Sequence, residues 1–267
     1  MSAIDRLFET LRAENRKALM PFITAGDPDL DFTADVLKQL DACGCPLCEL
    51  GIPYSDPIAD GPVIQASYTR ALDRKTHLTD IFEMTRRVAP TLSMPIVSMV
   101  SYAIVFRRGI ASFVAEAQAA GIAGAIVPDL PVEEAEPLAE VCRRKDFSLI
   151  QLVSPTTPRE RAIRIAASST GFLYYVSVAG ITGERTRLPA DLAENVAWLR
   201  ARTSLPICIG FGISQPEHVR QLAPVADGLI VGSAIVRRIA QADRQPRDEV
   251  LAQITDYIRQ LLGALES

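Results

Sequence analysis

Carboxylate chemistry is the first activity that the residues of this chain suggest. Glu49 ends the apolar run CPLCEL at positions 45–50, so the expected strand would carry its side chain away from water. Burial raises the pKa of a carboxyl group towards neutrality, where the group donates and accepts protons. We therefore predict that Glu49 is a general acid and base, and the structural alternative is an ion pair with an arginine.

A second carboxylate follows at short range. Asp60 lies in a loop whose three prolines restrict the backbone and hold the side chain over a pocket. Asp27 and Asp56 compete for the same role, because each also follows an expected strand. An Asx-type turn is the structural alternative for each of them. The residue types alone leave three candidates open.

Glycines gather in three segments that follow the last expected strands. These segments are ITGERTRLP at 181–189, GFGIS at 210–214 and VGSA at 231–234. Exposed backbone N–H groups in such turns bind phosphate, whereas the structural alternative is that the glycines only permit tight loops. Three neighbouring loops of this kind favour a phosphate site. Its expected members are Gly183, Gly210, Gly212, Gly232 and Ser233.

Other chemistries find less support. No lysine follows an expected strand, so a Schiff-base mechanism is not expected. Neither histidine lies at a strand end, and the cysteine group CGCPLC at 43–48 lacks a fourth ligand nearby, so buried thiols are favoured over a metal site. No GxGxxG motif follows the first expected strand. We therefore expect neither a metal nor a cofactor.

Eight short apolar runs alternate with helical patterns and must position these residues. The expected strands are 18–24, 46–51, 95–101, 122–127, 148–153, 171–178, 205–210 and 227–231. Parallel strands joined by right-handed crossovers close into a (β/α)8 barrel, or TIM barrel, whose active site lies at the C-terminal ends of the strands. A doubly wound open sheet is the second architecture that this alternation permits.

Helical patterns fill the intervals between the strands. The expected helices are 29–43, 62–74, 78–89, 109–119, 132–144, 158–168, 189–201, 215–221 and 247–265. Before the first strand, apolar residues at 4, 7, 8 and 11 predict an amphipathic helix that caps the barrel bottom. Nothing resembles a linker, so residues 1–267 are expected to form a single domain.

Composition excludes several function classes. Of the 267 residues, 48% are hydrophobic and 22% charged, with a net charge of −4, which argues against nucleic acid or an anionic membrane as the main partner. The N-terminus lacks the apolar region of a signal peptide. The uncharged stretches 88–106 and 165–183 are interrupted by Pro, Ser, Thr or Gly and are interpreted as loops with buried strands. We expect a soluble, cytoplasmic protein that acts on a small molecule.

The chain also resembles a known family. PFITAGDPD, ELGIPYSDPIADGPVIQ, VPDLPVEEA, ITGERTRLP and GFGIS are similar to the signature segments of the tryptophan synthase alpha subunit, and the match covers nearly the whole chain. The resemblance implies a cofactor-free barrel that cleaves indole-3-glycerol phosphate to indole and glyceraldehyde 3-phosphate for tryptophan biosynthesis. It also implies a pyridoxal-phosphate beta subunit that receives the indole, in a complex of two alpha and two beta chains.

The resemblance assigns roles to matching positions. Glu49 matches the family's acid and base, Asp60 the carboxylate that stabilises positive charge on the indole nitrogen, and Tyr174 the aromatic residue near the glutamate. Further positions match the indole slot (Phe22, Ile64, Phe211), the phosphate site (Gly183, Gly212, Gly232, Ser233), the loop that closes over the ligand (Thr182, Gly183) and the partner-facing loop (Pro53, Asp56).

One segment departs from the family pattern. In SMVSYAIVF at 98–106, Ser101 and Ala103 stand where the family usually has tyrosine and asparagine, so partner docking is expected to be weakened. Exposed prolines and a charge on the rigid loop of Pro53 and Asp56 favour a protein contact nonetheless. Two alternatives are a stand-alone lyase that releases indole and a catalytically silent regulatory partner of a beta subunit. Glu49 and Asp60 argue against the silent partner, because burying two carboxylates in an apolar pocket costs free energy that a pure binding protein need not spend.

Overall fold

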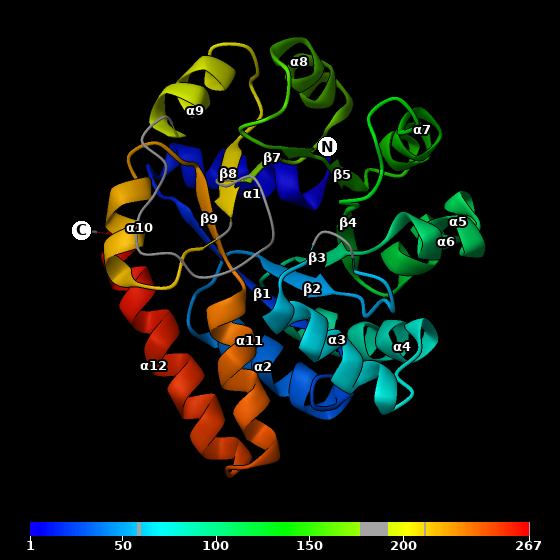
Figure 1. Cartoon of the computed structure of the whole chain (residues 1–267), viewed down its shortest axis with the longest axis vertical. Coiled ribbons are helices and arrows are strands. Elements are labelled where there is room, and N and C mark those ends of the chain that lie inside the picture. Colours follow the sequence, from blue (N-terminus) through cyan, green and yellow to red (C-terminus); the bar gives the residue numbers. More distant parts are fainter. Residues whose placement is uncertain (58–59, 177–191, 211, 267) are drawn as a thin grey trace.

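The computed structural model describes residues 1–57, 60–176, 192–210 and 212–266. Within these residues, one parallel sheet curves around the centre of the molecule and the helices surround it (Figure 1). Its strands are β1 Ala18–Thr24, β2 Cys48–Gly51, β3 Ile96–Met99, β4 Ile122–Ile126, β5 Ser148–Ile150, β6 Leu152–Val153, β7 Leu173–Val176, β8 Ile207–Gly210 and β9 Gly228–Val231. All eight expected strands are therefore present.

The strand order confirms the barrel. Neighbours run β5-β4-β3-β2-β1-β9-β8-β7-β6, so β1 pairs with both the second and the last strand of the chain. A doubly wound sheet reverses direction at a switch point and leaves two distant edges, which excludes that alternative here. The expected strand 148–153 is in fact two strands separated by Gln151. The two ends of the sheet thus lie one residue apart in the chain, and the barrel is nearly closed.

Side chains alternate between the barrel interior and the helical layer, because successive residues of a strand point to opposite faces. In β2, Leu50 packs in the outer core with the helices, whereas Leu47, just before the strand, belongs to the inner cluster. Glu49 shares the inward parity of Leu47 and is in register with Phe22 of β1 and Val97 of β3. The backbone pattern itself thus turns Glu49 into the barrel.

The helices cover the outside of the sheet. They are α1 Ala3–Ala13, α2 Leu30–Ala42, α3 Pro62–Asp73, α4 Leu78–Val88, α5 Tyr102–Arg108, α6 Ile110–Ala119, α7 Glu136–Arg144, α8 Arg159–Ser168, α9 Leu192–Arg200, α10 Pro216–Leu222, α11 Ser233–Ile239 and α12 Arg247–Glu266. No described helix is long and apolar enough to cross a membrane.

Three helical features differ from the sequence prediction. The short helices α5 and α11 were not predicted, and α7 begins at Glu136 rather than at 132. Ser101 caps the start of α5 by accepting a hydrogen bond from the N–H of Ala103, and Gly109, at φ 87°, separates α5 from α6. Helices of seven residues carry little periodic pattern, although α10, of the same length, was predicted at 215–221.

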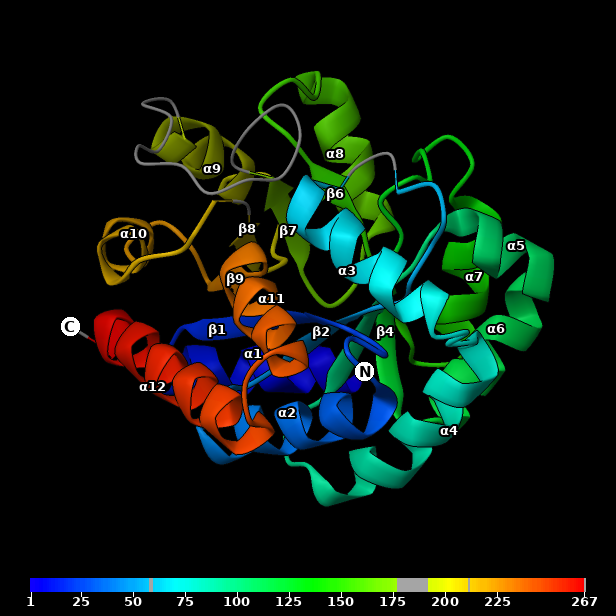
Figure 2. The same ribbon diagram turned by 60° about the horizontal axis from the view of Figure 1, so that its bottom comes forward.

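The N-terminal helix closes the bottom of the barrel, as predicted. Ile4, Phe8 and Leu11 of α1 are buried in the inner cluster, together with residues at the N-terminal ends of the strands. The rings of Phe8 and Phe172 lie 5.7 Å apart. Figure 2 shows α1 crossing the barrel beneath β1. The opposite end, where the strands finish, is the end that carries the candidate site.

Candidate active site

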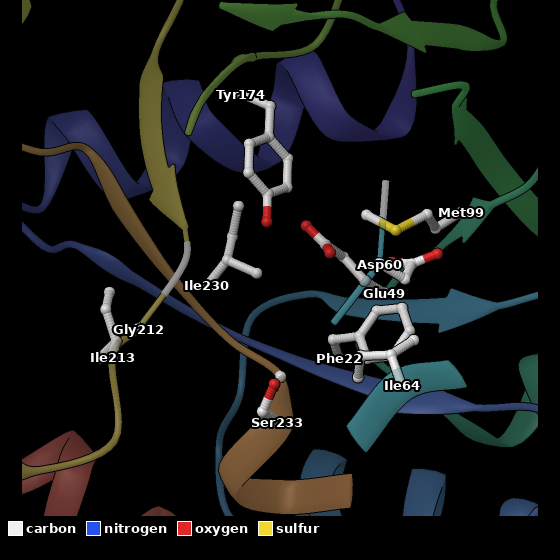
Figure 3. Close-up of a pocket in the computed structure, with 11 residues that line it drawn as sticks. Phe22, Glu49, Asp60, Ile64, Met99, Tyr174, Gly212, Ile213, Ile230 and Ser233 are labelled. Atoms are coloured by element: carbon white, nitrogen blue, oxygen red, sulfur yellow. The ribbon is translucent and has the colours of Figure 1, made fainter. Parts of the chain in front are cut away.

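A pocket opens at the C-terminal ends of the strands (Figure 3). Polar and apolar side chains from five strands and from the segments that follow them line it. The lining residues are Phe22, Glu49, Asp60, Ile64, Met99, Tyr174, Gly212, Ile213, Ile230, Gly232 and Ser233. Figure 3 shows the hydroxyl of Tyr174 and the carboxyl groups of Glu49 and Asp60 turned into the same space. The pocket therefore brings together most of the residues that the sequence singled out.

Glu49 is the most strongly perturbed group of the pocket. Its side chain is fully buried, and neither carboxylate oxygen has a hydrogen-bonding partner among the residues that the structure describes. Desolvation raises the pKa of Glu49 well above its ordinary value. A buried charge without a counter-charge is costly, so the group is held in its neutral form. Glu49 is thus a protonated carboxyl group aimed into the pocket, and no arginine in the part of the chain that the structure describes forms the alternative ion pair with it.

Asp60 faces the same space with a smaller perturbation. Burial, followed by the nearby negative charge of Asp129, raises the pKa of Asp60 to about 6. Gln65 fixes the backbone here, because its side-chain amide donates a 2.7 Å hydrogen bond to the carbonyl of Asp60. At neutral pH this carboxyl group is mostly ionised. The pocket therefore contains a neutral acid and a carboxylate.

The other two candidate carboxylates lie elsewhere. Asp27 is buried, and both of its oxygens accept hydrogen bonds from Arg70 of α3 at 2.8 and 2.7 Å. Asp56 is exposed and accepts a 2.6 Å hydrogen bond from Ser55. Neither residue lines the pocket. Of the three aspartates that the sequence left open, only Asp60 stands beside Glu49.

Tyr174 occupies its place because β8 ends in a glycine beside the Tyr174 hydroxyl. A Cβ atom at Gly210 would lie 2.2 Å from the Tyr174 hydroxyl oxygen, so any larger residue would displace the ring. Burial raises the pKa of Tyr174 well above its ordinary value, and the charges of Glu49 and Asp60 raise it further. The phenol remains protonated beside the two carboxyl groups.

The apolar wall is built from β1 and α3. Phe22 and Ile64 are both buried and belong to one small cluster beside the two carboxyl groups. A Cβ atom at Gly51 would lie 2.5 Å from the Phe22 ring, so glycine is required there. A buried 2.6 Å hydrogen bond between Thr24 and Ser67 ties β1 to α3. These contacts fix a flat apolar slot next to ionisable groups.

The third wall is mostly backbone. Gly212 adopts φ 82°, a conformation that favours glycine, and Gly232 and Ser233 stand where β9 passes into α11. Further along α11, the N–H groups of Ile235 and Val236 pair with the Gly232 carbonyl. The first N–H groups of α11 and the Ser233 hydroxyl are placed to bind an anion in this wall.

Comparison with known proteins decides the family. A family model described as tryptophan synthase alpha chain matches residues 8–262. The chain is 61% identical to the tryptophan synthase alpha chain of Rhodopirellula baltica over 245 residues, which are 91% of this chain and 88% of that protein. It is 44% identical to that of Rippkaea orientalis, with 98% of each chain covered. The chain belongs to the tryptophan synthase alpha chain family.

Solved structures agree with this assignment. A structure of Mycobacterium tuberculosis tryptophan synthase superposes with a TM-score of 0.90 at 30% identity, covering 100% of this chain and 99% of that chain. The tryptophan synthase alpha chain of Legionella pneumophila subsp. pneumophila gives a TM-score of 0.87 at 35% identity, covering 100% and 98%. As a member of the tryptophan synthase alpha chain family, the chain has a lyase role in tryptophan biosynthesis.

Not every residue expected from the family resemblance can be placed. Thr182, Gly183 and Phe211 lie outside the described residues. Pro53 is buried, so the expectation of an exposed proline there is wrong, whereas Asp56 on the same loop is exposed. Pro53 comes two residues after β2 and still belongs to a buried stretch, whereas Ser55 and Asp56 in the following turn are exposed.

A second hollow adjoins the pocket and was not anticipated from the sequence. We call it the side cavity, and it shares Asp60 and Met99 with the pocket. Its lining residues are Ile52, Tyr54, Asp56, Pro57, Asp60, Tyr68, Met99, Val100, Ser101, Pro128 and Asp129. No sequence signal marked Gln65, Tyr68 or Asp129 as neighbours of Asp60, because their proximity arises only when α3 and the segment after β4 fold over the loop.

Proposed function

We propose that this tryptophan synthase alpha chain cleaves indole-3-glycerol phosphate to indole and glyceraldehyde 3-phosphate, with Glu49 as acid and base and Asp60 as the charge-stabilising carboxylate. The observation that carries these roles is the pairing of a neutral, unpartnered Glu49 with an Asp60 whose pKa is about 6 in one pocket. Two carboxyl groups with separated pKa values can act as proton donor and as anion at the same pH.

The proposed reaction needs only these groups. The Glu49 carboxyl donates its proton to the indole ring carbon that bears the glycerol chain, and the resulting positive charge on the ring nitrogen faces the Asp60 carboxylate. The Glu49 carboxylate then accepts the proton of the adjacent glycerol hydroxyl. The carbon–carbon bond breaks, its electron pair returns to the indole ring, and an aldehyde remains on the departing triose phosphate. Tyr174 packs against this centre and keeps water out.

The walls of the pocket support the substrate's orientation. The indole ring lies against the apolar wall of Phe22 and Ile64, while the phosphate contacts the backbone at Gly212 and Gly232 and the hydroxyl of Ser233. The family resemblance alone adds three further residues to this proposal. They are Gly183 at the phosphate site, Thr182 in the loop that closes over the ligand, and Phe211 in the indole slot. Because the ring and the phosphate are both anchored in the pocket, the bond that breaks is held beside the two carboxyl groups.

The partner proposal rests on the surface next to the side cavity. A beta subunit is implied by the family, and we propose an assembly of two alpha and two beta chains that docks at this surface. Asp56 is exposed on one rim, and α5 presents Ala103 and Phe106, the latter 69% exposed, on the other. Pro53 supports the loop from below. If Ala103 faces the partner, Ala103→Asn should tighten association, measured by titration calorimetry.

The test is a product analysis of the purified chain. Incubation with indole-3-glycerol phosphate should yield indole and glyceraldehyde 3-phosphate in equal amounts, faster when a beta subunit is added. For the chain without a beta subunit, chelator and borohydride should leave the rate unchanged, because the proposed chemistry uses neither a metal nor an imine. Absence of indole under both conditions would refute the lyase. Equal rates with and without the beta subunit, together with no detectable complex at tens of micromolar, would favour a stand-alone lyase.

A further inference from the structure

Tyr68 is a buried tyrosine that neither the substrate pocket nor the proposed mechanism uses. It lies on the inward face of α3 with Ile64, Ser67 and Ala71, and its side chain packs in the cluster of Phe22 and Ile64. Whereas Ile64 lines the substrate pocket, Tyr68 lines the side cavity. A phenol in a wall where an aliphatic residue would fill the same space calls for an explanation in terms of its hydroxyl group.

The position of that hydroxyl is defined by its neighbours. Its oxygen lies 3.1 Å from the place that a Cβ atom of Gly51 would occupy, and Gly51 is two residues after Glu49 on the same face of β2. The hydroxyl therefore lies next to the end of β2, the strand that carries Glu49. Asp60 lines both the substrate pocket and the side cavity. The tyrosine and the aspartate thus share one small enclosure.

The electrostatics agree with this placement. Burial raises the pKa of Tyr68 well above its ordinary value, and the charge of Asp60, followed by that of Glu49, raises it further. A phenol with such a pKa keeps its proton at every pH at which the protein is active. It can therefore offer a hydrogen bond to a carboxylate without competing for the proton.

Other charged or titratable groups also face Asp60 among the described residues. Glu49 and Tyr174 approach from the substrate pocket, whereas Tyr54, Asp56 and Asp129 line the side cavity. Asp129 is fixed there, because its carboxylate accepts hydrogen bonds from the Ser101 hydroxyl at 2.6 Å and from the Tyr102 N–H at 2.8 Å. Its negative charge disfavours an ionised Asp60. The ionised form of Asp60 therefore needs a hydrogen-bond donor in the side cavity to offset the charge of Asp129.

Tyr68 and Asp60 line the same cavity without a direct hydrogen bond between them in this structure. We propose that Tyr68 is a positioning residue for Asp60: when Asp60 ionises, the Tyr68 hydroxyl turns to donate a hydrogen bond to one oxygen of the carboxylate and leaves the other oxygen for the substrate. The tyrosine thereby offsets the repulsion from Asp129. This inference rests on the proposed function in one respect, since it takes the ionised form of Asp60 to be the active one.

The experiment measures Asp60 directly. The carboxyl carbon of Asp60 is titrated by NMR in protein labelled with ¹³C-aspartate, and its signal is identified by its loss in Asp60→Asn. In Tyr68→Phe, which keeps the ring and its packing, we expect the Asp60 midpoint to rise by about half a unit to one unit, because an anion loses a hydrogen-bond donor. Asp129→Asn should shift the midpoint in the opposite direction. Tyr257→Phe, which removes a buried hydroxyl that donates to the Ser214 carbonyl, is the control and should leave it unchanged.

A kinetic arm separates positioning from simple packing. In Tyr68→Phe the acid limb of kcat should move to higher pH by the same amount, with KM little changed and kcat approaching the parent value at high pH. An Asp60 midpoint that is the same in Tyr68→Phe and in the parent would overturn the proposal. The NMR arm needs no substrate, so a shifted midpoint in a protein that forms no indole would refute the proposed lyase while leaving the Tyr68 contact standing.

Discussion

At the scale of single residues, two carboxyl groups of the same pocket differ because their surroundings differ. Glu49 projects from the middle of a buried strand and has no partner among the described residues, whereas Asp60 sits at the junction of two cavities with its backbone held by Gln65. Desolvation therefore acts fully on Glu49 and partly on Asp60. This difference assigns proton donation to Glu49 and anionic stabilisation to Asp60.

The first prediction concerns the pH dependence of the lyase. The reaction needs Asp60 ionised, so kcat should rise with pH through an acid limb near the Asp60 pKa of about 6. It also needs Glu49 protonated, so kcat should fall again at higher pH, as Glu49 loses its proton through its raised pKa. A steady-state pH profile checks this shape. A rate that stays flat from pH 5 to 8 would show that Asp60 does not act as the anion.

The second prediction links Glu49 to stability. Because the folded pKa of Glu49 is raised, the folded state keeps a proton that the unfolded chain releases above about pH 4.3. This group alone should lower the free energy of unfolding by about 1.4 kcal/mol for each pH unit between those two pKa values. Glu49→Gln has no proton to release at this position, so its free energy of unfolding should rise relative to that of the parent as the pH increases. Urea unfolding at several pH values measures it, and parallel curves for the two proteins would contradict a neutral, buried Glu49.

The sequence contained the main acid but not its surroundings. An acid at the inward parity of an apolar strand is visible as a pattern, so Glu49 could be predicted from CPLCEL alone. The choice of Asp60 over Asp27 required the Asp27–Arg70 ion pair, whose partners are 43 residues apart. Tyr68 and Asp129 likewise approach Asp60 only through folding. Contacts between distant segments leave no local pattern that a single sequence can reveal.

At the scale of elements, the two ends of the barrel serve different purposes. The strand ends carry the pocket, while α1 seals the interior at the other end with Ile4, Phe8 and Leu11. Most long elements were predictable because apolar periodicity persists over several turns or pleats. The seven-residue helices α5 and α11 were missed, although α10 of the same length was predicted, and the single polar residue Gln151 divides the run SLIQLV into β5 and β6. Short elements depend on caps and on tertiary packing instead.

The third prediction tests this division between the two ends. Phe8 is 4% exposed and packs against Phe172 inside the barrel floor. Phe8→Ala should lower the free energy of unfolding by about 3–5 kcal/mol, because it leaves a cavity in a closed core. The exposed neighbour Glu9 on the same helix provides the control, and Glu9→Ala should change stability by less than about 0.5 kcal/mol. At a temperature where both variants are folded, kcat should match the parent, and a matching loss of kcat in Phe8→Ala would mean that the floor shapes the site.

At the scale of the whole molecule, the pocket lies at one end of the barrel and the described helices lie outside the sheet. We propose that the 267 residues fold as one domain, since strands from the beginning and the end of the chain pair directly as β1 and β9. The pocket and the side cavity share Asp60 and lie beside the surface where a beta subunit is proposed to dock. A partner at that surface would therefore affect the group that carries the negative charge.

The most direct measurement of the central claim is the steady-state rate of indole release by Glu49→Gln and by the parent, with the beta subunit present. The substitution removes the proton donor with little change in volume, so the rate should fall by at least about 100-fold. Binding of glycerol phosphate, measured by calorimetry on the same preparations, should persist because the phosphate wall is untouched. An indole release rate within tenfold of the parent would place the acid and base on another residue and contradict the account.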